Sequence, residues 1–402
     1  MNTHILVISQ YFYPEQFRIN DICTEWVKRG YKVTVVTGIP NYPHGKYYKG
    51  YGFLKRRKET YNGITIIRIP LIPRGHNSIM LVLNYLSFVV SGFIWGILTK
   101  IRADFVFIYE VSPMTQALPG VWYAKKRKIP CYLYVQDLWP ENVEIMTGIK
   151  NNLIIGSIGK MVDYLYSRCT KIFTTSNSFI RSINERGVPK EKLEYWPQYA
   201  EDFYIPLNRK SIPEIPDDGA FNIIFTGNIG NAQGLDILPK AATLLKEKKL
   251  TRNIRFNLVG DGRYKNELID IINKDDVTYM FNFSSKQPAV RIPEFIAACD
   301  VAFLSLTNSR LFAMTIPAKL QSYMACGIPI IASADGETNK IINEAKAGVC
   351  CPAGDYKKLA EIIVEMSDMS ANQLSRLGIK AKEYSNKYFN KEQLLNKMDE
   401  YF

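Results

Sequence analysis

The chain has 402 residues, which is too long for one ordinary hydrophobic core and predicts two domains. Hydrophobic residues make up 47% of it and aromatic residues 12%, a composition that excludes an intrinsically disordered protein. The 51 Lys and Arg residues against 38 Asp and Glu give a net charge of +13, which suits nucleic acid, an anionic membrane surface or phosphorylated small molecules as partners.

The cysteines and histidines argue against a metal site. The seven cysteines lack the paired spacing of zinc ligands and several lie in apolar runs, so we expect free core thiols in a reducing compartment. Three histidines are too few for a histidine-rich metal site. A strand is predicted to begin at His4. The residues before it do not form the charged segment and apolar stretch that make up a secretory signal. We therefore expect a cytoplasmic protein.

Short apolar runs alternate with helical stretches throughout the N-terminal half. Strands alternating with helices predict a parallel, doubly wound sheet, in which ligands bind outside the carboxyl ends of the strands. The predicted strands are 4–9, 31–37, 64–69, 105–109, 131–135 and 172–175.

Four of the loops after these strands carry carboxylates, amides and aromatic rings, a mixture suited to hydroxyl-rich or phosphorylated ligands. The carboxylates are Glu15, Glu110, Asp137 and Glu141. Any one of them could equally well be a helix N-cap or a first-turn acid. Together they are expected to converge on one edge of one sheet, which favours a binding site.

Residues 79–98 are almost wholly apolar and long enough to span a bilayer. Asn84, Ser87 and Ser91 fall at helical spacing and form one weakly polar face, as in a helix that is buried or lies in a membrane interface. A predicted strand follows at once, so a spanning helix would interrupt the α/β alternation. We therefore favour a buried or interfacial helix over a transmembrane one.

A proline-rich linker at 199–219 precedes a second alternating series. Its predicted strands are 221–225, 254–259, 277–280, 301–304, 328–332 and 348–351. The first strand runs into the glycine-rich stretch 227–234, and an apolar helical pattern follows from Leu235. Such a loop between a strand and a helix N-terminus can hold a phosphate or can simply turn the chain.

Two further motifs place cations at the same predicted edge. The turn Val-Gly-Asp-Gly at 259–262 leads to Lys265, and the helical stretch 317–329 carries Lys319. The second sheet therefore also presents glycines and lysines at its ligand edge. Two sheets with facing ligand edges would form a cleft.

The sequence resembles glycosyltransferase family 4, of GT-B architecture, over nearly its whole length. The motifs that carry the resemblance are V-G-D-G-x-x-K, P-x-K-L-x-x-Y-M-A-C-G-x-P and the glycine loop near residue 230. The stretches Q-Y-F-Y-P-E-Q-F-R-I-N-D, G-I-P-N-Y-P, Q-D-L-W-P-E and G-N-I-G-N-A-Q-G are similar to a narrower branch, the WbuB-like and WcaI-like transferases of bacterial surface polysaccharides.

The resemblance implies two Rossmann-like doubly wound domains facing across a cleft. We expect an acceptor-binding domain at 1–203, a nucleotide-sugar-binding domain at 204–380 and a C-terminal helix at 381–402. The apolar stripe of that last segment fits a helix that crosses back to the first domain, and almost equally a helix packed on its own domain.

The resemblance also implies transfer with retention at the anomeric carbon and without a metal. The chain has no D-x-D triplet, so cations and backbone N–H groups would have to stabilise the leaving diphosphate. Many members carry an Arg and a Lys in the glycine loop, where this chain has Asn228 and Gln233. The family's two glutamates fall on Ser322 and near Met314. We read these departures as a trait of the narrower branch.

The expected site residues follow from these motifs. For the diphosphate they are Gly227, Asn228, Gly230, Asn231, Gln233, Gly234, Lys265 and Lys319, and for the nucleoside and donor sugar Ser322, Glu337 and Arg310. Asp137 is the first candidate catalytic residue and Glu15 the second, and Arg18, Asn20, Asn41 and Glu141 are candidate acceptor or sugar contacts.

The function predicted is transfer of a sugar from a UDP-sugar to a lipid-linked sugar. The donor sugar is expected to be an N-acetylated deoxyhexosamine such as L-FucNAc. The acceptor is expected to be an undecaprenyl-diphosphate-linked sugar of O-antigen or capsule synthesis. We expect no cofactor and no nucleic acid, and a peripheral position on the inner face of the cell membrane, which the basic charge suits. The alternatives are a GT-B sugar-nucleotide epimerase and a non-catalytic scaffold of a polysaccharide assembly complex.

Overall fold

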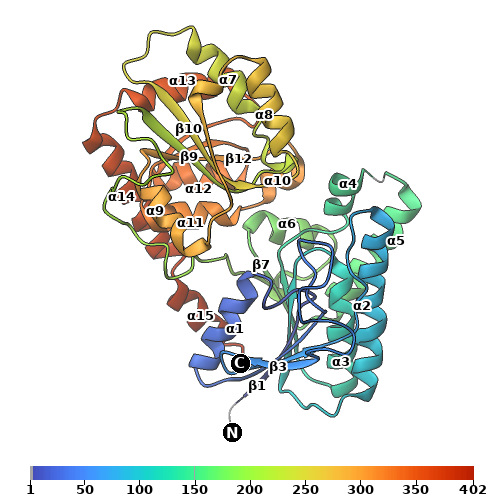
Figure 1. Ribbon diagram of the computed structural model, residues 1–402. Coiled ribbons are helices and arrows are strands. Elements are labelled where there is room, and N and C mark those ends of the chain that lie inside the picture. The colour runs from blue at the N-terminus through green and yellow to red at the C-terminus, as the bar shows by residue number, and fades with distance from the viewer. Residues whose placement is uncertain (1–2, 149) are drawn as a thin grey trace. The chain divides into compact units, whose positions relative to one another are not determined.

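The computed structural model describes residues 3–148 and 150–402. The chain divides into two compact units, Met1–Trp196 with Tyr401–Phe402, and Pro197–Glu400. Each unit is a sheet with helices on both faces (Figure 1). The prediction of two doubly wound α/β domains is confirmed.

The sheet of unit 1 has the strand order β3-β4-β2-β1-β5-β6-β7-β8. All neighbours pair in parallel except β3 and β4. The order reverses between β1 and β5, where a doubly wound sheet opens its ligand crevice. The strands are β1 (His4–Ile8), β2 (Lys32–Thr37), β3 (Lys58–Tyr61), β4 (Ile64–Arg68), β5 (Phe105–Glu110), β6 (Cys131–Val135), β7 (Lys171–Thr174) and β8 (Leu193–Tyr195).

The helices of unit 1 use apolar stripes to cover this sheet. In α1, the residues Ile19, Ile22, Cys23 and Trp26 are buried at helical spacing. The helices are α1 (Arg18–Lys28), α2 (Ser78–Leu98), η1 (Met114–Ala117), α3 (Leu118–Arg127), α4 (Glu141–Thr147), α5 (Asn152–Arg168), α6 (Asn177–Glu185) and η2 (Lys190–Lys192).

The sheet of unit 2 is wholly parallel, with the order β11-β10-β9-β12-β13-β14. The prediction of a strand at 277–280 is wrong. Val277 and Met280 are buried three residues apart about a 3₁₀ turn, and the strand begins one residue later. The strands are β9 (Phe221–Asn228), β10 (Ile254–Asp261), β11 (Phe281–Ser284), β12 (Val301–Ser305), β13 (Ile330–Ser333) and β14 (Gly348–Cys351).

Two apolar cores lie on opposite faces of this sheet. Ile223 and Phe225 point into one core and Ile224 into the other, as the alternation of a strand requires. The covering helices are η3 (Asn231–Gln233), α7 (Ile237–Lys246), α8 (Lys265–Lys274), η4 (Thr278–Met280), η5 (Ala289–Arg291), α9 (Ile292–Ala297), α10 (Arg310–Met314), α11 (Ala318–Cys326), α12 (Glu337–Ala345), α13 (Tyr356–Ser367), α14 (Ala371–Tyr388) and α15 (Lys391–Asp399).

The last two residues of the chain belong to unit 1, whereas α14 and α15 belong to unit 2. The ring of Phe402 stacks on Phe105 with centroids 4.4 Å apart and meets the edge of Trp26 at 5.3 Å. The hydroxyl of Tyr132 donates a hydrogen bond to the carbonyl of Tyr401 at 2.9 Å. Residues 401 and 402 therefore pack into the N-terminal unit.

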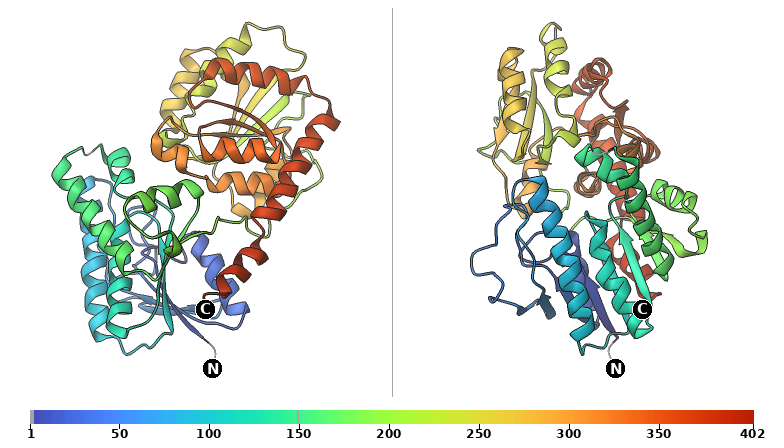
Figure 2. Two further views of the ribbon diagram at one scale, coloured as in Figure 1. Left: turned by 180° about the vertical axis from the view of Figure 1, so that it is seen from behind. Right: turned by 90° about the vertical axis from the view of Figure 1, so that its right-hand side faces the viewer.

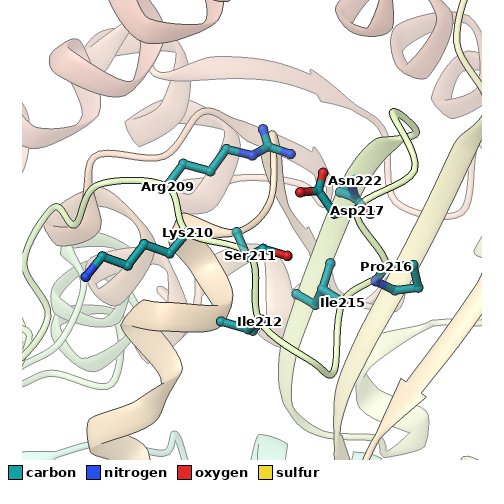
Figure 3. Close-up of a pocket in the computed structure, with 9 residues that line it drawn as sticks. Arg209, Lys210, Ser211, Ile212, Ile215, Pro216, Asp217 and Asn222 are labelled. Atoms are coloured by element: carbon teal, nitrogen blue, oxygen red, sulfur yellow. The ribbon is translucent and has the colours of Figure 1, made fainter.

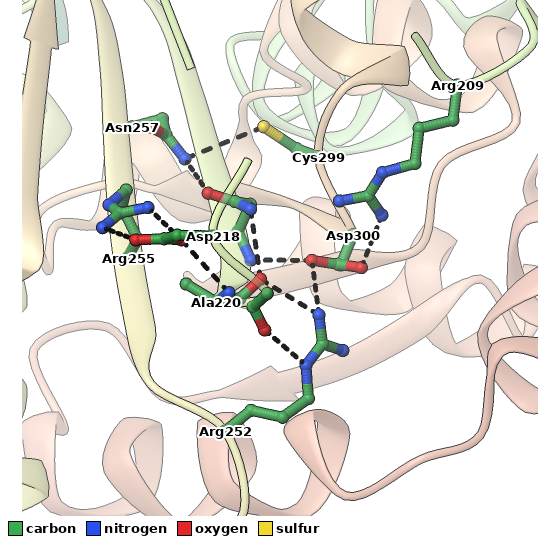
Figure 4. Close-up of polar contacts among 10 residues, drawn as sticks. Arg209, Asp218, Ala220, Arg252, Arg255, Asn257, Cys299 and Asp300 are labelled. Atoms are coloured by element: carbon green, nitrogen blue, oxygen red, sulfur yellow. Dashed lines mark hydrogen bonds and ion pairs between the residues drawn. The ribbon is translucent and has the colours of Figure 1, made fainter. Parts of the chain in front are cut away.

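An ion-pair network fixes the amino edge of the sheet in unit 2 (Figure 4). The carboxylate of Asp300 accepts hydrogen bonds from the backbone N–H of Asn222 at 2.7 Å and from Arg209 at 2.8 Å. Arg252 lies 3.5 Å from the same carboxylate. Asp300 thus ties the linker and the first residues of β9 to the start of β12.

We predict that Asp300→Ala lowers the free energy of unfolding by about 1–3 kcal/mol, because it leaves a buried backbone N–H and a half-buried guanidinium without their partner. Urea denaturation of the variant and the parent measures this. The control is Glu383→Ala, which removes an exposed ion pair with Lys380 inside α14 and should change nothing measurable. Equal losses in the two variants would contradict the assigned role of the network.

Candidate active site

The glycine loop of unit 2 and the end of β9 pack backbone against backbone on the end of β10 and the turn after it. A Cβ added to Gly260 would lie 1.9 Å from the carbonyl oxygen of Gly227, and one added to Gly262 would lie 2.1 Å from that of Ile229. The N–H of Ile229 donates to the carbonyl of Asp261 at 2.9 Å, and the N–H of Tyr264 donates to the carbonyl of Ile229 at 3.1 Å. Only glycine permits this approach.

The other side of the loop is tied to the end of β12. The N–H of Thr307 donates to the carbonyl of Ala232 at 3.1 Å, and the Ser305 hydroxyl donates to the carbonyl of Gln233. A 3₁₀ turn and Gly234, with φ +56°, intervene before α7, which therefore begins at Ile237 and not at Leu235. The loop is held on both sides, while residues Gly227, Asn228 and Asn231 face solvent.

Lys319 brings a positive charge to the back of this loop. Its Nζ donates to Oε1 of Gln233 at 2.5 Å and lies 3.9 Å from the ring centroid of Phe225. Burial of the ammonium group lowers the pKa of Lys319 to about 7. The side-chain amide of Gln233 thus connects the lysine to the backbone of the loop. Its oxygen is oriented toward Lys319 by this hydrogen bond.

The other predicted cations lie apart from Lys319. Lys265 begins α8, and its Nζ lies 5.9 Å from the ring centroid of Phe283 in the edge strand β11. Arg310 begins α10 and is exposed. Lys319, in α11, is hydrogen-bonded to a side chain of the loop.

Two of the three predicted nucleoside and sugar residues, Ser322 and Glu337, are buried. Ser322 is 8% exposed, and its hydroxyl donates to the carbonyl of Ala318 within α11 at 3.3 Å. Glu337 is 5% exposed and begins α12 directly after Gly336. A Cβ added to Gly336 would lie 1.9 Å from the carbonyl oxygen of Ala313, so α12 starts against the backbone of α10.

A cavity of about 220 Å³ in unit 2 lies at the opposite edge of the sheet (Figure 3). Its lining includes Arg209, Asp217 and Asn222, the second residue of β9, and none of the predicted donor residues. Parallel sheets bind ligands at the carboxyl ends of their strands. We therefore assign this cavity to the linker and not to the donor site.

In unit 1, Asp137 is held by the loop that follows β5. Its Oδ2 accepts hydrogen bonds from both the N–H and the hydroxyl of Ser112, each at 2.8 Å. The Ser112 hydroxyl in turn accepts from Nε1 of Trp139 at 3.1 Å and from the amide of Asn142 at 2.5 Å. Burial raises the pKa of Asp137, and the two bonds from Ser112 oppose that shift.

Glu110 lies next to this network at the end of β5. It is completely buried. Burial first, and then the charge of Asp137, raise the pKa of Glu110 well above its ordinary value, while the backbone N–H groups of Asp137 and Gln136 oppose the rise. The charged form of Glu110 is therefore disfavoured beside Asp137. The sequence marked it as a loop carboxylate but gave it no role.

Glu15 binds backbone groups of two loops. Its Oε1 accepts from the N–H groups of Asn41 at 2.8 Å and Tyr42 at 2.6 Å, and its Oε2 accepts from that of Phe12 at 3.3 Å. Burial raises the pKa of Glu15 to about 7, while these N–H groups and the charge of Arg68 oppose the rise. With 2% exposure, Glu15 is placed to position the loops rather than to touch a substrate.

Two predicted acceptor contacts also serve the loop framework. Asn41 is completely buried, and its Oδ1 accepts from the N–H of Arg74 at 2.9 Å. The amide of Asn20 donates to the carbonyl of Glu15 at 2.7 Å. Arg18 and Glu141 are half-buried at the first positions of α1 and α4.

Aromatic rings around these loops form a surface that was not among the predicted site residues. Phe17 stacks on Tyr11 at 5.2 Å, and Tyr42 meets Phe17 at 5.4 Å. The guanidinium of Arg74 lies 5.4 Å from the ring centroid of Tyr42, which is 38% exposed. The sequence signal was present in the Q-Y-F-Y-P and N-Y-P stretches, but the pairing of the rings depends on how the two loops meet.

Among the described residues, no three His, Cys, Asp or Glu gather as metal ligands.

Two family models match the chain with these two edges in place. The model described as "Glycosyl transferase 4-like domain" matches residues 16–198, and "Glycosyl transferases group 1" matches residues 209–384. The chain belongs to the family 4-like glycosyltransferases. One match falls on each unit, so Asp137 and the loop 227–234 lie inside the matched ranges.

The curated relatives of this glycosyltransferase are bacterial glycosyltransferases, and some are named for polysaccharide synthesis. It is 26% identical over 253 residues to "Probable glycosyltransferase WbjE" of Pseudomonas aeruginosa, a match that spans 60% of this chain and 61% of that protein. It is 25% identical to "Putative colanic acid biosynthesis glycosyl transferase WcaI" of Escherichia coli K12, over 83% of this chain and 84% of that protein.

Solved structures confirm the GT-B fold prediction. Sucrose-phosphate synthase from Thermosynechococcus elongatus superposes with a TM-score of 0.77 at 15% identity, covering 99% of this chain and 98% of that one. Anabaena Alr3699/HepE in complex with UDP and glucose superposes with a TM-score of 0.71 at 15% identity, covering 99% of both chains. At these identities the likeness concerns the fold.

Proposed function

We propose that unit 2 binds the diphosphate of a UDP-sugar at the loop 227–234. The contact that carries this proposal is the bond from Lys319 to Gln233, because it places a cation behind a loop that is otherwise neutral. Backbone N–H groups and glycines of the loop orient the diphosphate, and Lys319 supplies charge through the Gln233 amide. Lys265 and Arg310 are proposed to complete the charge, and Glu337 to contact the ribose or sugar.

The proposed reaction is transfer with retention and without a metal or other cofactor. The bond from the anomeric carbon to the phosphate oxygen breaks, and a bond from that carbon to the acceptor oxygen forms on the same face. The leaving phosphate oxygen takes the proton of the acceptor hydroxyl, so no separate base is required. Cations and oriented amides stabilise the charge that develops on the diphosphate.

Unit 1 is proposed to bind the acceptor sugar. Asp137 directs an oxygen held by Ser112 toward the ligand edge, and Tyr42 with Arg74 offers an aromatic face and a cation. A lipid-linked sugar fits such a site, since its hydroxyls need polar partners and its diphosphate needs a cation. Glu15 is proposed to act by positioning the loops that carry these groups.

The pathway proposed is the synthesis of a bacterial surface polysaccharide, such as O-antigen or capsule. The names of two relatives, WcaI and "Amylovoran biosynthesis glycosyltransferase AmsK" from Erwinia amylovora, support it. The donor sugar proposed is N-acetylated, with L-FucNAc the first candidate, and the acceptor is an undecaprenyl-diphosphate-linked sugar. The seven free cysteines suit the reducing cytoplasm, on the inner side of the membrane.

We predict that one UDP-sugar raises the melting temperature of the protein in a screen of UDP-, GDP- and dTDP-sugars. A ligand at a hundredfold excess over its Kd stabilises the folded state by about 2.7 kcal/mol. Lys319→Met should reduce the shift, because it removes the charge behind the loop, whereas Lys248→Met at an exposed site should preserve it.

Absence of a shift with every sugar nucleotide at millimolar concentration would contradict the transferase and favour the scaffold. Conversion of a UDP-N-acetylhexosamine to its C2 epimer without an acceptor would contradict it in favour of the epimerase.

We predict that Asp137→Asn lowers the rate of transfer by about 10–10²-fold, with donor binding unchanged, because the variant loses a hydrogen bond from the acceptor hydroxyl to a charged carboxylate. Because burial raises the pKa of Asp137, the parent enzyme should lose activity on acidification at a pH above the ordinary pKa of an aspartate, near ~3.9. The variant should lack that limb. Asp163→Asn, an exposed partner of Arg186, is the control. A parent-like rate in Asp137→Asn would exclude the role.

A further inference from the structure

Helix α2 exposes the largest apolar surface of the part of the chain that the structure describes. It has 21 residues, none of them charged. Nine of the 21 exposed large hydrophobic side chains of the described residues lie on it, namely Ile79, Val82, Leu83, Leu86, Val90, Phe93, Ile94, Ile97 and Leu98. In Figures 1 and 2 the helix runs along the outside of unit 1. Patches of this kind mark an interaction surface.

The opposite face of α2 is built into unit 1. Asn84, Phe88 and Gly92 are its buried residues, spaced one turn apart. A Cβ added to Gly92 would lie 2.4 Å from the ring of Pro119, so α2 packs closely on α3. At 3.6 residues per turn, the nine exposed side chains cover about 160° of the helix, centred opposite this stripe.

This arrangement favours a helix that lies along the membrane surface over one that crosses a bilayer. By length and composition α2 could span one, but it joins β4 to β5, which lie in one sheet with β2 and β1 between them. Crossing would require Asn84 to leave its hydrogen bonds with Gln10 and Ile72. The helix therefore presents its apolar face while it stays packed along unit 1, as we expected of a buried or interfacial helix.

Cations surround the C-terminal end of α2. Lys126 donates to the carbonyls of Gly96 at 3.1 Å and Ile97 at 2.9 Å, and Arg127 donates to that of Thr99 at 2.7 Å. Exposed cations adjoin them in the sequence, namely Lys100, Arg102, Lys125 and Lys128. An apolar helix face bordered by basic residues is the pattern of a helix bound in the interface of an anionic membrane.

We propose that α2 attaches this protein to an anionic phospholipid surface, with the helix axis in the membrane plane and its nine-residue face among the acyl chains. The outward face carries no charged group. Acyl chains require no hydrogen bonds from such a face, whereas a protein partner would form about one hydrogen bond per 100–200 Å² of interface. The neighbouring cations contact the lipid phosphates.

The same helix borders the predicted acceptor loops. Asn84 accepts from the amide of Gln10 at 2.8 Å and lies 3.5 Å from Oδ1 of Asn41. Attachment through α2 would hold these loops about one helix diameter, ~10 Å, from the lipid surface. This consequence for a lipid-linked acceptor rests on the proposed function, whereas the attachment itself does not.

Flotation of the full chain with vesicles tests the attachment. We expect flotation with vesicles of phosphatidylcholine and phosphatidylglycerol, and much less with phosphatidylcholine alone. Leu86→Glu with Val90→Glu should abolish it, while the matched pair Val290→Glu with Ile379→Glu, equally exposed in unit 2, should float like the parent. Retained circular dichroism and UDP-sugar binding establish that the variants are folded.

The charge dependence has its own pair of variants. Lys100→Glu with Lys125→Glu should weaken binding to the anionic vesicles by at least about fivefold per cation removed, whereas Lys248→Glu with Lys249→Glu should not.

Equal flotation of the parent and of Leu86→Glu with Val90→Glu would overturn the proposal. So would resistance of the bound protein to alkaline extraction, which indicates spanning, or a soluble dimer that Leu86→Glu dissociates while vesicles never bind. A failure of UDP-sugar binding alone would leave these outcomes unaffected and count against the proposed function.

Discussion

The close approach of two backbone segments governs the carboxyl edge of unit 2. Gly260, near the end of β10, and Gly262, in the turn after it, allow this segment to run against the end of β9 and the loop that follows, and no other residue type fits at 1.9 or 2.1 Å from a carbonyl oxygen. This contact, with the bonds to the end of β12, fixes where the loop amides point. The place of Gln233, and hence the place at which Lys319 delivers its charge, follows from it.

Desolvation gives both candidate edges their electrostatic character. Burial against Phe225 and Gln233 lowers the pKa of Lys319, and burial beside Asp137 raises the pKa of Glu110. A lowered pKa of a buried cation and a raised pKa of a buried acid both reduce the cost of an unpaired charge. An anionic ligand at the loop 227–234 favours the charged form of Lys319, which links donor binding to protonation.

The alternation of apolar strands and helices was enough to predict both sheets and the loops at their carboxyl ends, because that pattern reflects burial directly. It failed at Val277 and Met280, whose burial has the spacing of a 3₁₀ turn. It could not separate Asn41, buried at the centre of the loops, from a residue that faces a ligand, since both are amides after a strand. Nor could it reveal that Gln233 and Lys319, 86 residues apart, form a pair. Such contacts depend on how loops pack, which no local pattern encodes.

In this account Lys319 supplies the charge of a neutral diphosphate loop. Calorimetric titration with a UDP-sugar in buffers of different ionisation enthalpy is the most direct test. The free protein holds Lys319 with a pKa of about 7, and a bound diphosphate must raise it. Binding should therefore take up a proton at about pH 8, with affinity complete below the free pKa and lost as the pH rises through the bound one. Lys319→Met should bind more weakly and without proton uptake. Equal proton uptake by the parent and by Lys319→Met would contradict the account.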